Sequence, residues 1–280
     1  MLAPVHSGFG RGIIMKIGIV GCGGRMGRML VAEVVATAGC ELAGGTEAPN
    51  SPLIGQDVAE LAGLAAAGVA VGSDAEALFA ITDAVIDFTV PAATALHATL
   101  AARHRTALIA GTTGLSAEQQ AAVVAATKQT AVLQAANMSP GINMLMALTK
   151  RVAATLGADY DIEVLEMHHR HKVDAPSGTA LALGRAAAEG RQVVLDEVAQ
   201  RVRDGHTGAR RSGDIGFATL RGGDVAGEHT VIFAADGERL ELGHRASSRA
   251  VYARGAVRAA QWVYGKPPGL YSMLDVLGFA

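Results

Sequence analysis

The segment MKIGIVGCGGRMG, residues 15–27, decides the fold of this chain. An apolar strand is expected at residues 16–21, and it runs directly into a glycine-rich turn that precedes a helical stretch at residues 25–37. Glycines in such a turn let the backbone bend tightly and approach a pyrophosphate, whose charge is stabilised at the N-terminus of the helix. The segment therefore predicts the first strand–turn–helix unit of a dinucleotide-binding domain.

The glycine spacing departs from the GxGxxG fingerprint, because Met26 occupies the third glycine position. Gly21, Gly24 and Gly27 give GxxGxxG instead. On its own this loop is a weak signal, since a tight turn that binds nothing can have the same composition. Glu47 strengthens the prediction, because it lies 20 residues beyond Gly27, where a carboxylate can accept hydrogen bonds from ribose hydroxyls. The alternative for Glu47 is an ordinary solvated carboxylate in a loop.

The residue after Glu47 bears on the choice of cofactor. It is Ala48, whereas a cofactor with a ribose phosphate usually meets an arginine there, and the carboxylate itself repels that phosphate. Arg25 and Arg28, at the start of the first helix, can compensate only in part. We therefore expect NADH to be preferred and NADPH to be tolerated.

Apolar segments and alanine-rich helical stretches alternate through the rest of this half. Further strands are expected at residues 41–44, 69–71, 84–89, 106–110 and 131–134, and helices at residues 91–103 and 116–127. Apolar strands that are each followed by a helix are typical of a parallel sheet covered on both faces, which right-handed crossovers make doubly wound. The predicted fold class is therefore α/β, with a Rossmann-like doubly wound parallel sheet.

The pattern changes after residue 137. Helices are expected at residues 140–156, 177–188 and 248–263, and strands at residues 161–167, 214–220, 229–234 and 239–244. The last three strands have no helix between them, so we expect them to be antiparallel neighbours in a second, smaller α+β domain.

These patterns predict two domains. Residues 15–137 form the dinucleotide-binding domain, and the C-terminal residues 248–280 pack back onto it. Residues 138–247 form the second, smaller α+β domain, to which the family resemblance described below assigns substrate binding and tetramerisation. Residues 1–14 are expected to be a disordered leader, since Met15 opens a much better strand and the leader lacks the charged and apolar regions of a signal peptide.

Composition limits the possible partners. The chain has 280 residues, of which 50% are hydrophobic and 18% charged, and its formal net charge is −2. We therefore expect a globular protein with no nucleic-acid or membrane partner, and no apolar run reaches the roughly 18 residues that a span needs. Cys22 and Cys40 are the only cysteines, which is too few for a disulfide framework or a metal site and fits the cytoplasm.

Two further loops follow apolar strands, at what would be the carboxyl edge of the sheet, where ligands of open α/β sheets bind. They are AGTTGL, residues 110–115, and AANMSPG, residues 135–141. Both offer backbone and side-chain polar groups to a nicotinamide carboxamide. The alternative for either loop alone is an ordinary strand-to-helix turn.

The most unusual segment is EMHHRHKVDAPSGTA, residues 166–180. Five consecutive groups are cationic or can become so: His168, His169, Arg170, His171 and Lys172. Their mutual repulsion would be relieved by an anionic ligand, although a charge run is more often a solvated face. The PSGT sequence that follows begins a helix, whose exposed amides make a second anion site. Two adjacent anion sites suit a small dicarboxylate, and histidine beside lysine can supply a proton after hydride addition.

Six segments together resemble the dihydrodipicolinate reductase family, in the order in which that family has them. They are GCGGRMG, VIDFTVP, AGTTGL, AANMSPGIN, EMHHRHKVDAPSGTA and GLYSMLDVLG, and the resemblance extends from Met15 to the C-terminus. It implies 4-hydroxy-tetrahydrodipicolinate reductase activity, in which NAD(P)H reduces a dicarboxylate on the diaminopimelate route to lysine. It also implies a homotetramer built through the smaller domain.

The resemblance further implies roles for individual residues. His168 would be a proton donor or acceptor and Lys172 a proton donor, whereas His169, Gly178 and Thr179 would hold the substrate carboxylate. The cofactor would be held by Gly21, Cys22, Gly23, Gly24, Arg25, Met26, Glu47, Gly111, Thr112, Thr113, Ala135, Ala136, Asn137 and Met138. No metal is implied. The departure from the family is Ala48, where many members have arginine.

Two other classes of protein remain as alternatives. Another two-domain Rossmann dehydrogenase is one, but an aspartate-semialdehyde dehydrogenase needs a nucleophilic cysteine, and neither Cys22 nor Cys40 lies in the second half. A homoserine dehydrogenase would leave HHRHK beside PSGT unexplained, whereas a sugar or inositol dehydrogenase of similar architecture stays open as an alternative. A non-catalytic dinucleotide sensor is the other alternative, and it would bind nucleotide without turnover.

Overall fold

The chain forms two compact units. The computed structural model describes residues 14–279, so the leader predicted at residues 1–14 lies, except for its last residue, outside the described part. The first unit comprises the described residues up to Ser139 together with Ala250–Gly278, and the second comprises Pro140–Arg249.

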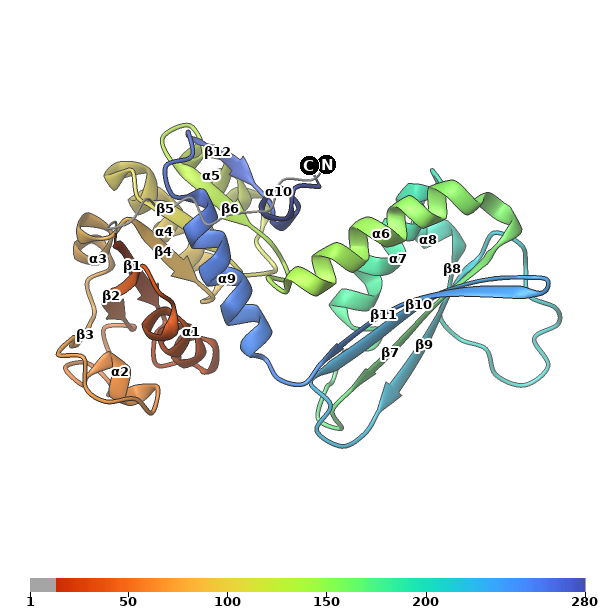
Figure 1. Cartoon of the computed structure of the whole chain (residues 1–280), viewed down its shortest axis with the longest axis horizontal. Helices are drawn as coiled ribbons and strands as arrows, with labels where there is room; N and C mark the ends of the chain where they lie inside the picture. The colour runs from red at the N-terminus through yellow and green to blue at the C-terminus, as the bar shows by residue number, and fades with distance from the viewer. Residues whose placement is uncertain (1–13, 280) are drawn as a thin grey trace. The chain divides into compact units, whose positions relative to one another are not determined.

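The first unit is built on a seven-stranded sheet (Figure 1). Its strands are β1 (Met15–Val20), β2 (Cys40–Thr46), β3 (Val71–Gly72), β4 (Ala84–Asp87), β5 (Ala107–Ala110), β6 (Ala131–Gln134) and β12 (Gly269–Tyr271). They lie in the order β12-β6-β5-β4-β1-β2-β3, and every pair is parallel. The order reverses between β1 and β4, as in a doubly wound fold. The predicted Rossmann-like sheet is therefore confirmed.

Helices cover both faces of this sheet. They are α1 (Arg25–Ala36), α2 (Val58–Leu61), α3 (Ala75–Ile81), α4 (Pro91–His104), α5 (Ala117–Ala126), α9 (Ala250–Val263) and α10 (Met273–Leu277). Neighbouring strand residues enter different cores, because successive side chains of a strand point to opposite faces. On β4, Ile86 joins the core that contains residues of α1 and α9, whereas Val85 joins the core that contains residues of α3, α4 and α5.

Four elements of this unit were not predicted. The helices α2 and α3 have only a few residues each, and the pair β12 and α10 follows the helix-breaking sequence GKPPG. β12 exists because it pairs with β6, which tertiary structure decides and local sequence does not. β3 occupies Val71–Gly72 where residues 69–71 were expected, since its pairing partner in β2 is Gly45–Thr46.

The second unit holds a five-stranded sheet in the order β11-β10-β7-β9-β8. Its strands are β7 (Asp161–His168), β8 (Ala199–Gln200), β9 (Ile215–Arg221), β10 (Gly227–Ala235) and β11 (Glu238–Ala246), and its helices are α6 (Pro140–Leu156), the 3-10 turn η1 (Gly157–Asp159), α7 (Gly178–Gly190) and α8 (Leu195–Val198). The predicted α+β class is confirmed.

The prediction that the last three strands would be antiparallel neighbours is wrong for β9. β10 is antiparallel to both β11 and β7, but β9 is not paired with β10 and instead runs parallel to β7. The chain reaches β9 from β7 through α7, and a connection that crosses over a helix returns the next strand in the same direction. The short β8, which also lies in that connection, pairs parallel with β9.

α6 and α7 lie together on one face of this sheet (Figure 1). β7 alternates along its whole length, and its buried residues are Ile162, Val164, Glu166 and His168. The first two belong to the hydrophobic core with α7. Glu166 and His168 lie on the same buried face, so two ionisable side chains follow the apolar residues at the C-terminal end of this strand.

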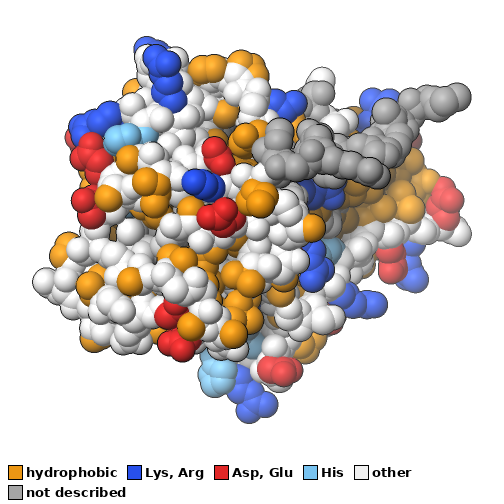
Figure 2. All heavy atoms as spheres, turned by 60° about the vertical axis from the view of Figure 1, so that its left-hand side comes forward, with side chains coloured by type: hydrophobic (Ala, Val, Ile, Leu, Met, Phe, Trp, Pro, Cys, Tyr) orange, Lys and Arg blue, Asp and Glu red, His pale blue; other side chains and the backbone are white. Residues whose placement is uncertain are grey.

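Charges of both signs are mixed over the surface. On the face shown in Figure 2, lysine and arginine side chains are interspersed with aspartate and glutamate, and hydrophobic side chains are scattered among them. Within residues 14–279, no helix combines the length and the apolar composition that a membrane crossing requires.

Candidate active site

The glycine loop joins β1 to α1, and Gly27 sets how closely the two elements approach. A Cβ atom at Gly27 would fall 2.1 Å from the carbonyl oxygen of Gly21 and 2.7 Å from Cα of Cys22. Gly21 has φ +69°, a left-handed conformation that favours glycine. Gly24 is the N-cap of α1 and provides no side-chain cap, so the first amides of this helix are not satisfied by a capping side chain.

Glu47 lies against this loop. Its Oε1 accepts a hydrogen bond of 2.7 Å from the backbone nitrogen of Gly23. Ala48, the next residue, is exposed. On the other side of the loop, Arg28 donates from Nε to the carbonyl oxygen of Gly23 at 2.8 Å. Glu47 and Arg28, 19 residues apart in the chain, therefore both hydrogen-bond to the backbone of Gly23.

Cys22 is in the loop, but its side chain is fully buried. A Cβ at Gly45 would fall 2.9 Å from the Cys22 sulfur, which shows how closely β2 packs against it. Burial, with a smaller contribution from the charge of Glu47, raises the pKa of this thiol to about 11. Cys22 is therefore a protonated core side chain, and only its backbone can face a ligand of the loop.

The loops after β5 and β6 lie at the same carboxyl edge, because β5 is the neighbour of both β4 and β6. The backbone nitrogen of Gly111 donates to the carbonyl oxygen of Asp87, and that of Ala135 to the carbonyl oxygen of Ala110. Thr113 and Ala136 are exposed, whereas the Met138 side chain is buried in the core. The Oδ1 atom of Asn137 accepts from the backbone nitrogen of Ser139 at 2.8 Å, which shapes the second loop.

Asp87 is a residue of this edge that the sequence analysis did not single out. It is fully buried at the end of β4, and its Oδ2 lies 2.8 Å from His97 Nδ1. Its Oδ1 accepts from the Thr89 hydroxyl at 2.6 Å and from the Thr112 hydroxyl at 3.3 Å. Thr112 in turn accepts from the Thr94 hydroxyl at 2.8 Å. A single carboxylate in an otherwise apolar strand is the signal that could have revealed this network.

In the second unit, His168 ends β7 with its ring almost fully buried. Its Nδ1 lies 2.6 Å from Oε2 of Glu166, which is 1% exposed. Arg221, at the end of the neighbouring strand β9, donates from Nη1 to the same Oε2 at 2.8 Å. Burial opposes ionisation of Glu166, but hydrogen bonds from Arg221, His168 and the Ser177 amide together hold its pKa below the usual value. Glu166 is therefore a buried carboxylate.

A second imidazole packs against His168. The ring of His229, on the neighbouring strand β10, meets that of His168 edge-on, with centroids 5.1 Å apart. His229 Nε2 lies 3.3 Å from the Ser177 hydroxyl. Burial, reinforced by the charge of His168, lowers the pKa of His229 to about 4, so this ring is neutral at physiological pH. His229 was not predicted from the sequence.

His169 and Lys172 lie in the turn that follows β7, where the backbone nitrogen of Lys172 donates to the carbonyl oxygen of His169 at 3.1 Å. Arg249, 80 residues away in the chain, approaches His169 Nε2 with its Nη2 at 3.3 Å. Burial and the charge of Arg249 lower the pKa of His169, which favours its neutral form. Lys172 Nζ pairs with Asp174 Oδ1 at 2.8 Å. Acidic neighbours thus partly neutralise the positive charge of the cationic run. This neutralisation was not predicted from the sequence.

The PSGT segment lies at the start of α7. Ser177 is the N-cap, and its hydroxyl accepts from the backbone nitrogen of Ala180 at 3.1 Å. Its own backbone nitrogen donates to Oε1 of Glu166 at 2.9 Å. Gly178 and Thr179 form the first turn, and a Cβ at Gly178 would meet no atom within 4 Å. The structure thus brings the start of α7 and His168 together around one carboxylate.

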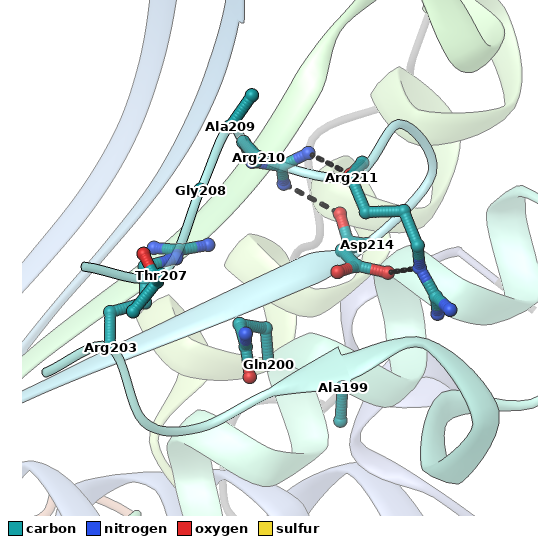
Figure 3. A pocket seen from close by; sticks show the side chains of 9 residues that line it. All are labelled: Ala199, Gln200, Arg203, Thr207, Gly208, Ala209, Arg210, Arg211 and Asp214. Carbon is teal, nitrogen blue, oxygen red and sulfur yellow. Dashed lines mark hydrogen bonds and ion pairs between the residues drawn. The ribbon is translucent and has the colours of Figure 1, made fainter. Parts of the chain in front are cut away.

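One pocket lies elsewhere in the second unit, beside β8 and β9, and has a volume of about 640 Å³ (Figure 3). No residue of the predicted sites lines it. Its three arginines already have carboxylate partners: Arg203 and Arg210 pair with Glu163, and Arg211 pairs with Asp214. This pocket therefore offers no free cation to an anionic ligand. Within the described part of the chain, no group of three or more His, Cys, Asp or Glu side chains is arranged to hold a metal ion.

Comparison with known proteins gives matches along almost the whole chain. The family model described as "Dihydrodipicolinate reductase, N-terminus" matches residues 15–138, and that described as "Dihydrodipicolinate reductase, C-terminus" matches residues 141–277. A 4-hydroxy-tetrahydrodipicolinate reductase of Ruegeria pomeroyi is 58% identical over 95% of this chain and 98% of its own length. One of Rhodopseudomonas palustris is 54% identical over 95% of this chain and 98% of its own length.

Solved structures agree on the fold. A dipicolinate-bound dihydrodipicolinate reductase from Paenisporosarcina sp. TG-14 superimposes with a TM-score of 0.76 at 22% identity, over 94% of this chain and 99% of that one. An amine dehydrogenase from Mycobacterium smegmatis gives a TM-score of only 0.57 at 14% identity, over 92% and 95% of the two chains. Two family models that together span nearly the whole chain, and relatives more than half identical to it, lead to one conclusion: this chain belongs to the dihydrodipicolinate reductase family.

Proposed function

We propose that this chain catalyses the reduction of 4-hydroxy-tetrahydrodipicolinate to tetrahydrodipicolinate by NADH or NADPH, with loss of water, on the diaminopimelate route to lysine. The observation that carries the proposal is the arrangement around Glu166. One buried carboxylate holds both a histidine that can transfer a proton and the helix start that can bind an anion. Membership of the family supplies the identity of the substrate.

The first unit would hold the cofactor, and NADH would be preferred. The bound nicotinamide supplies a hydride. The first unit offers the whole cofactor a tight glycine turn, a carboxylate for the ribose and two loops at the same sheet edge. Exposed Ala48 provides no cation for a ribose phosphate, which supports the preference for NADH. Cys22 and Met138 would contribute only their backbones, since both side chains are buried.

The second unit would bind the dicarboxylate. The amides of Gly178 and Thr179 at the start of α7 can receive one carboxylate, because helix N-termini favour anions. The other cationic and polar groups would come from His169, Lys172 and Arg249. In the ion pair between Lys172 and Asp174, the side chain of Asp174 is exposed to solvent. Exposed ion pairs are weak, so a substrate carboxylate can compete with Asp174 for Lys172.

Protonation would follow hydride addition. The substrate loses water, its hydroxyl together with a hydrogen of the neighbouring ring carbon, and the double bond that results accepts the hydride and then a proton, so the reaction consumes one proton in all. Either His168, through the ring nitrogen that does not face Glu166, or Lys172, through Nζ, would supply it. No other step is assigned to these two side chains.

We also propose that the protein is a cytoplasmic homotetramer. Both cysteines of the chain are free, which suits a reducing compartment. The sheet of the second unit has one face without a covering helix among residues 140–249, and that face includes Leu165, Met167, Leu220 and Ile232. A sheet face of this composition suits pairing with a second copy.

The test is a coupled assay in which a dihydrodipicolinate-forming synthase makes the substrate from pyruvate and aspartate semialdehyde. Absorbance of NADH and of NADPH would be followed in parallel. We expect synthase-dependent oxidation that is faster with NADH. Nucleotide binding without oxidation would overturn the proposal and favour a dinucleotide sensor.

A further inference from the structure

Glu166 lies at the centre of the polar network of the second unit. It is 1% exposed, it is on the same face of β7 as His168, and all of its hydrogen-bond partners are donors. Each of its two oxygens serves a different part of the proposed site.

The Oε2 atom determines which nitrogen of His168 carries the proton. It accepts from Arg221 Nη1 at 2.8 Å and lies 2.6 Å from His168 Nδ1. An ionised carboxylate can only accept hydrogen bonds, so the proton between these atoms belongs to Nδ1. In the neutral ring, Nε2 is then the unprotonated nitrogen. Gly227 lies beside this atom, since a Cβ there would be 3.2 Å from Nε2.

The Oε1 atom fixes the start of α7. It accepts from the Ser177 backbone nitrogen at 2.9 Å and from Arg221 Nη2 at 3.1 Å. Arg221 Nη2 also donates to the carbonyl oxygen of Asp174 at 2.7 Å, which ties the segment between β7 and α7 to the same pair. The distance between His168 and the first turn of α7 is therefore set through a single side chain.

We infer that Glu166 is a positioning residue that holds His168 in its Nδ1-protonated form and keeps His168 in register with the anion-binding start of α7. This inference rests on the proposed function, because it assigns Nε2 as the atom that exchanges the proton. Glu166 does not itself touch the substrate. It plays the part that a buried carboxylate plays toward a catalytic imidazole in other enzymes.

A purely structural role is the competing explanation. Under it, Glu166 would serve only to neutralise the guanidinium of Arg221, and the state of the His168 ring would not matter. The two explanations differ in three observables: the tautomer of His168, the split between kcat and KM, and the dependence of the Glu166 effect on the presence of His168.

The first experiment is nitrogen NMR of the full chain with labelled histidine at mildly alkaline pH, with the His168 signals assigned by their loss in His168→Asn. We expect a proton on Nδ1 of His168 in the wild type and a mixture of tautomers in Glu166→Gln. A wild-type ring without a proton on Nδ1 would overturn the inference. This measurement needs no activity, so it remains decisive if the proposed reaction fails.

The second experiment compares Glu166→Gln with Glu163→Gln. Glu163 is on the same strand but on its opposite face, and it makes equivalent arginine contacts, with Arg203 and Arg210. We expect Glu166→Gln to lower kcat about 10- to 100-fold with a smaller change in KM, and Glu163→Gln to leave kcat unchanged. Equal losses in the two variants would mean that loss of any Glu–Arg pair on this strand has this effect.

The decisive kinetic control is the double variant. If Glu166 acts through His168, then Glu166→Gln should cause no further loss of kcat in a His168→Asn background. A full additional loss there would contradict the inference. Glu166→Asp, which keeps the charge, is the variant to use if Glu166→Gln does not fold, and it should retain more kcat than His168→Asn.

Discussion

The Oε1 atom of Glu47 lies 2.7 Å from the backbone nitrogen of Gly23, so a hydrogen bond joins the carboxylate after β2 to the glycine loop after β1. The carboxylate is already in place at the loop. The exposed neighbour Ala48 is therefore the position where a residue of this segment can change the interaction with a ribose phosphate.

The first prediction concerns this position. Ala48→Arg should raise kcat/KM for NADPH relative to NADH by about tenfold or more, because a hydrogen bond between charged groups contributes about 1.5–3 kcal/mol. Steady-state kinetics with both cofactors measure the ratio. Ala48→Met adds similar bulk without charge and should leave the ratio as it is. A preference for NADPH in the wild type would refute our view of the cofactor.

The second prediction concerns the close approach at Gly27. A Cβ there would fall 2.1 Å from a backbone oxygen, which cannot move aside as a side chain can. We expect Gly27→Ala to destabilise the protein by about 1–3 kcal/mol and to weaken NADH binding. Urea unfolding and cofactor titration measure the two effects. At Gly72 the nearest atom would be 3.9 Å away, so Gly72→Ala is the matched control and should be nearly neutral.

The third prediction concerns Asp87. The Asp87→Asn variant loses the negative charge that His97, Thr89 and Thr112 contact in a buried site. We expect a loss of about 1–3 kcal/mol in unfolding free energy and a higher KM for NADH, since Thr112 is in a loop that we propose binds the cofactor. Asp74 caps α3, where asparagine is an equally good cap, so Asp74→Asn should change neither quantity. An unchanged KM in Asp87→Asn would separate the network from cofactor binding.

The fourth prediction concerns pH. The pKa of His229 falls from 6.5 in the unfolded reference to about 4 in the folded protein. As pH decreases, the unfolded chain therefore binds this proton before the folded protein does. The contribution of the neutral ring to the free energy of unfolding is complete above about pH 6.5. Between about pH 6.5 and about pH 4 the free energy of unfolding decreases by at most roughly 1.4 kcal/mol per pH unit. His229→Gln should flatten unfolding free energy against pH in that window. Identical slopes in the two proteins would contradict the neutral buried ring.

The dinucleotide half was predictable because its signals are local. The run from Met15 to Gly27 contains the strand, the turn and the helix in one segment, and Glu47 follows at a characteristic spacing. Tertiary pairing decided what was missed. β12 is a strand only because β6 is beside it, and β9 is parallel to β7 because α7 lies between them.

The candidate site shows the same limit. The run HHRHK and the following PSGT were visible in the sequence, and the structure places His168 and Ser177 around Glu166. The contact between Arg249 and His169 joins residues 80 positions apart, and no local pattern could have predicted it. Glu166 itself was predictable in principle, since it alternates with His168 on a strand whose other residues on that face are apolar.

The proposed reaction requires that hydride passes from the nicotinamide to the substrate ring. Single-turnover reaction of the enzyme with deuterated NADH and synthase-generated substrate, followed by mass spectrometry of the product, tests it most directly. We expect the wild type to form tetrahydrodipicolinate that carries one deuterium. Lys172→Ala should form this product much more slowly, whereas Lys150→Ala should form it as fast as the wild type. Cofactor oxidation without deuterium in that product, or no oxidation by a protein that binds NADH, would contradict it.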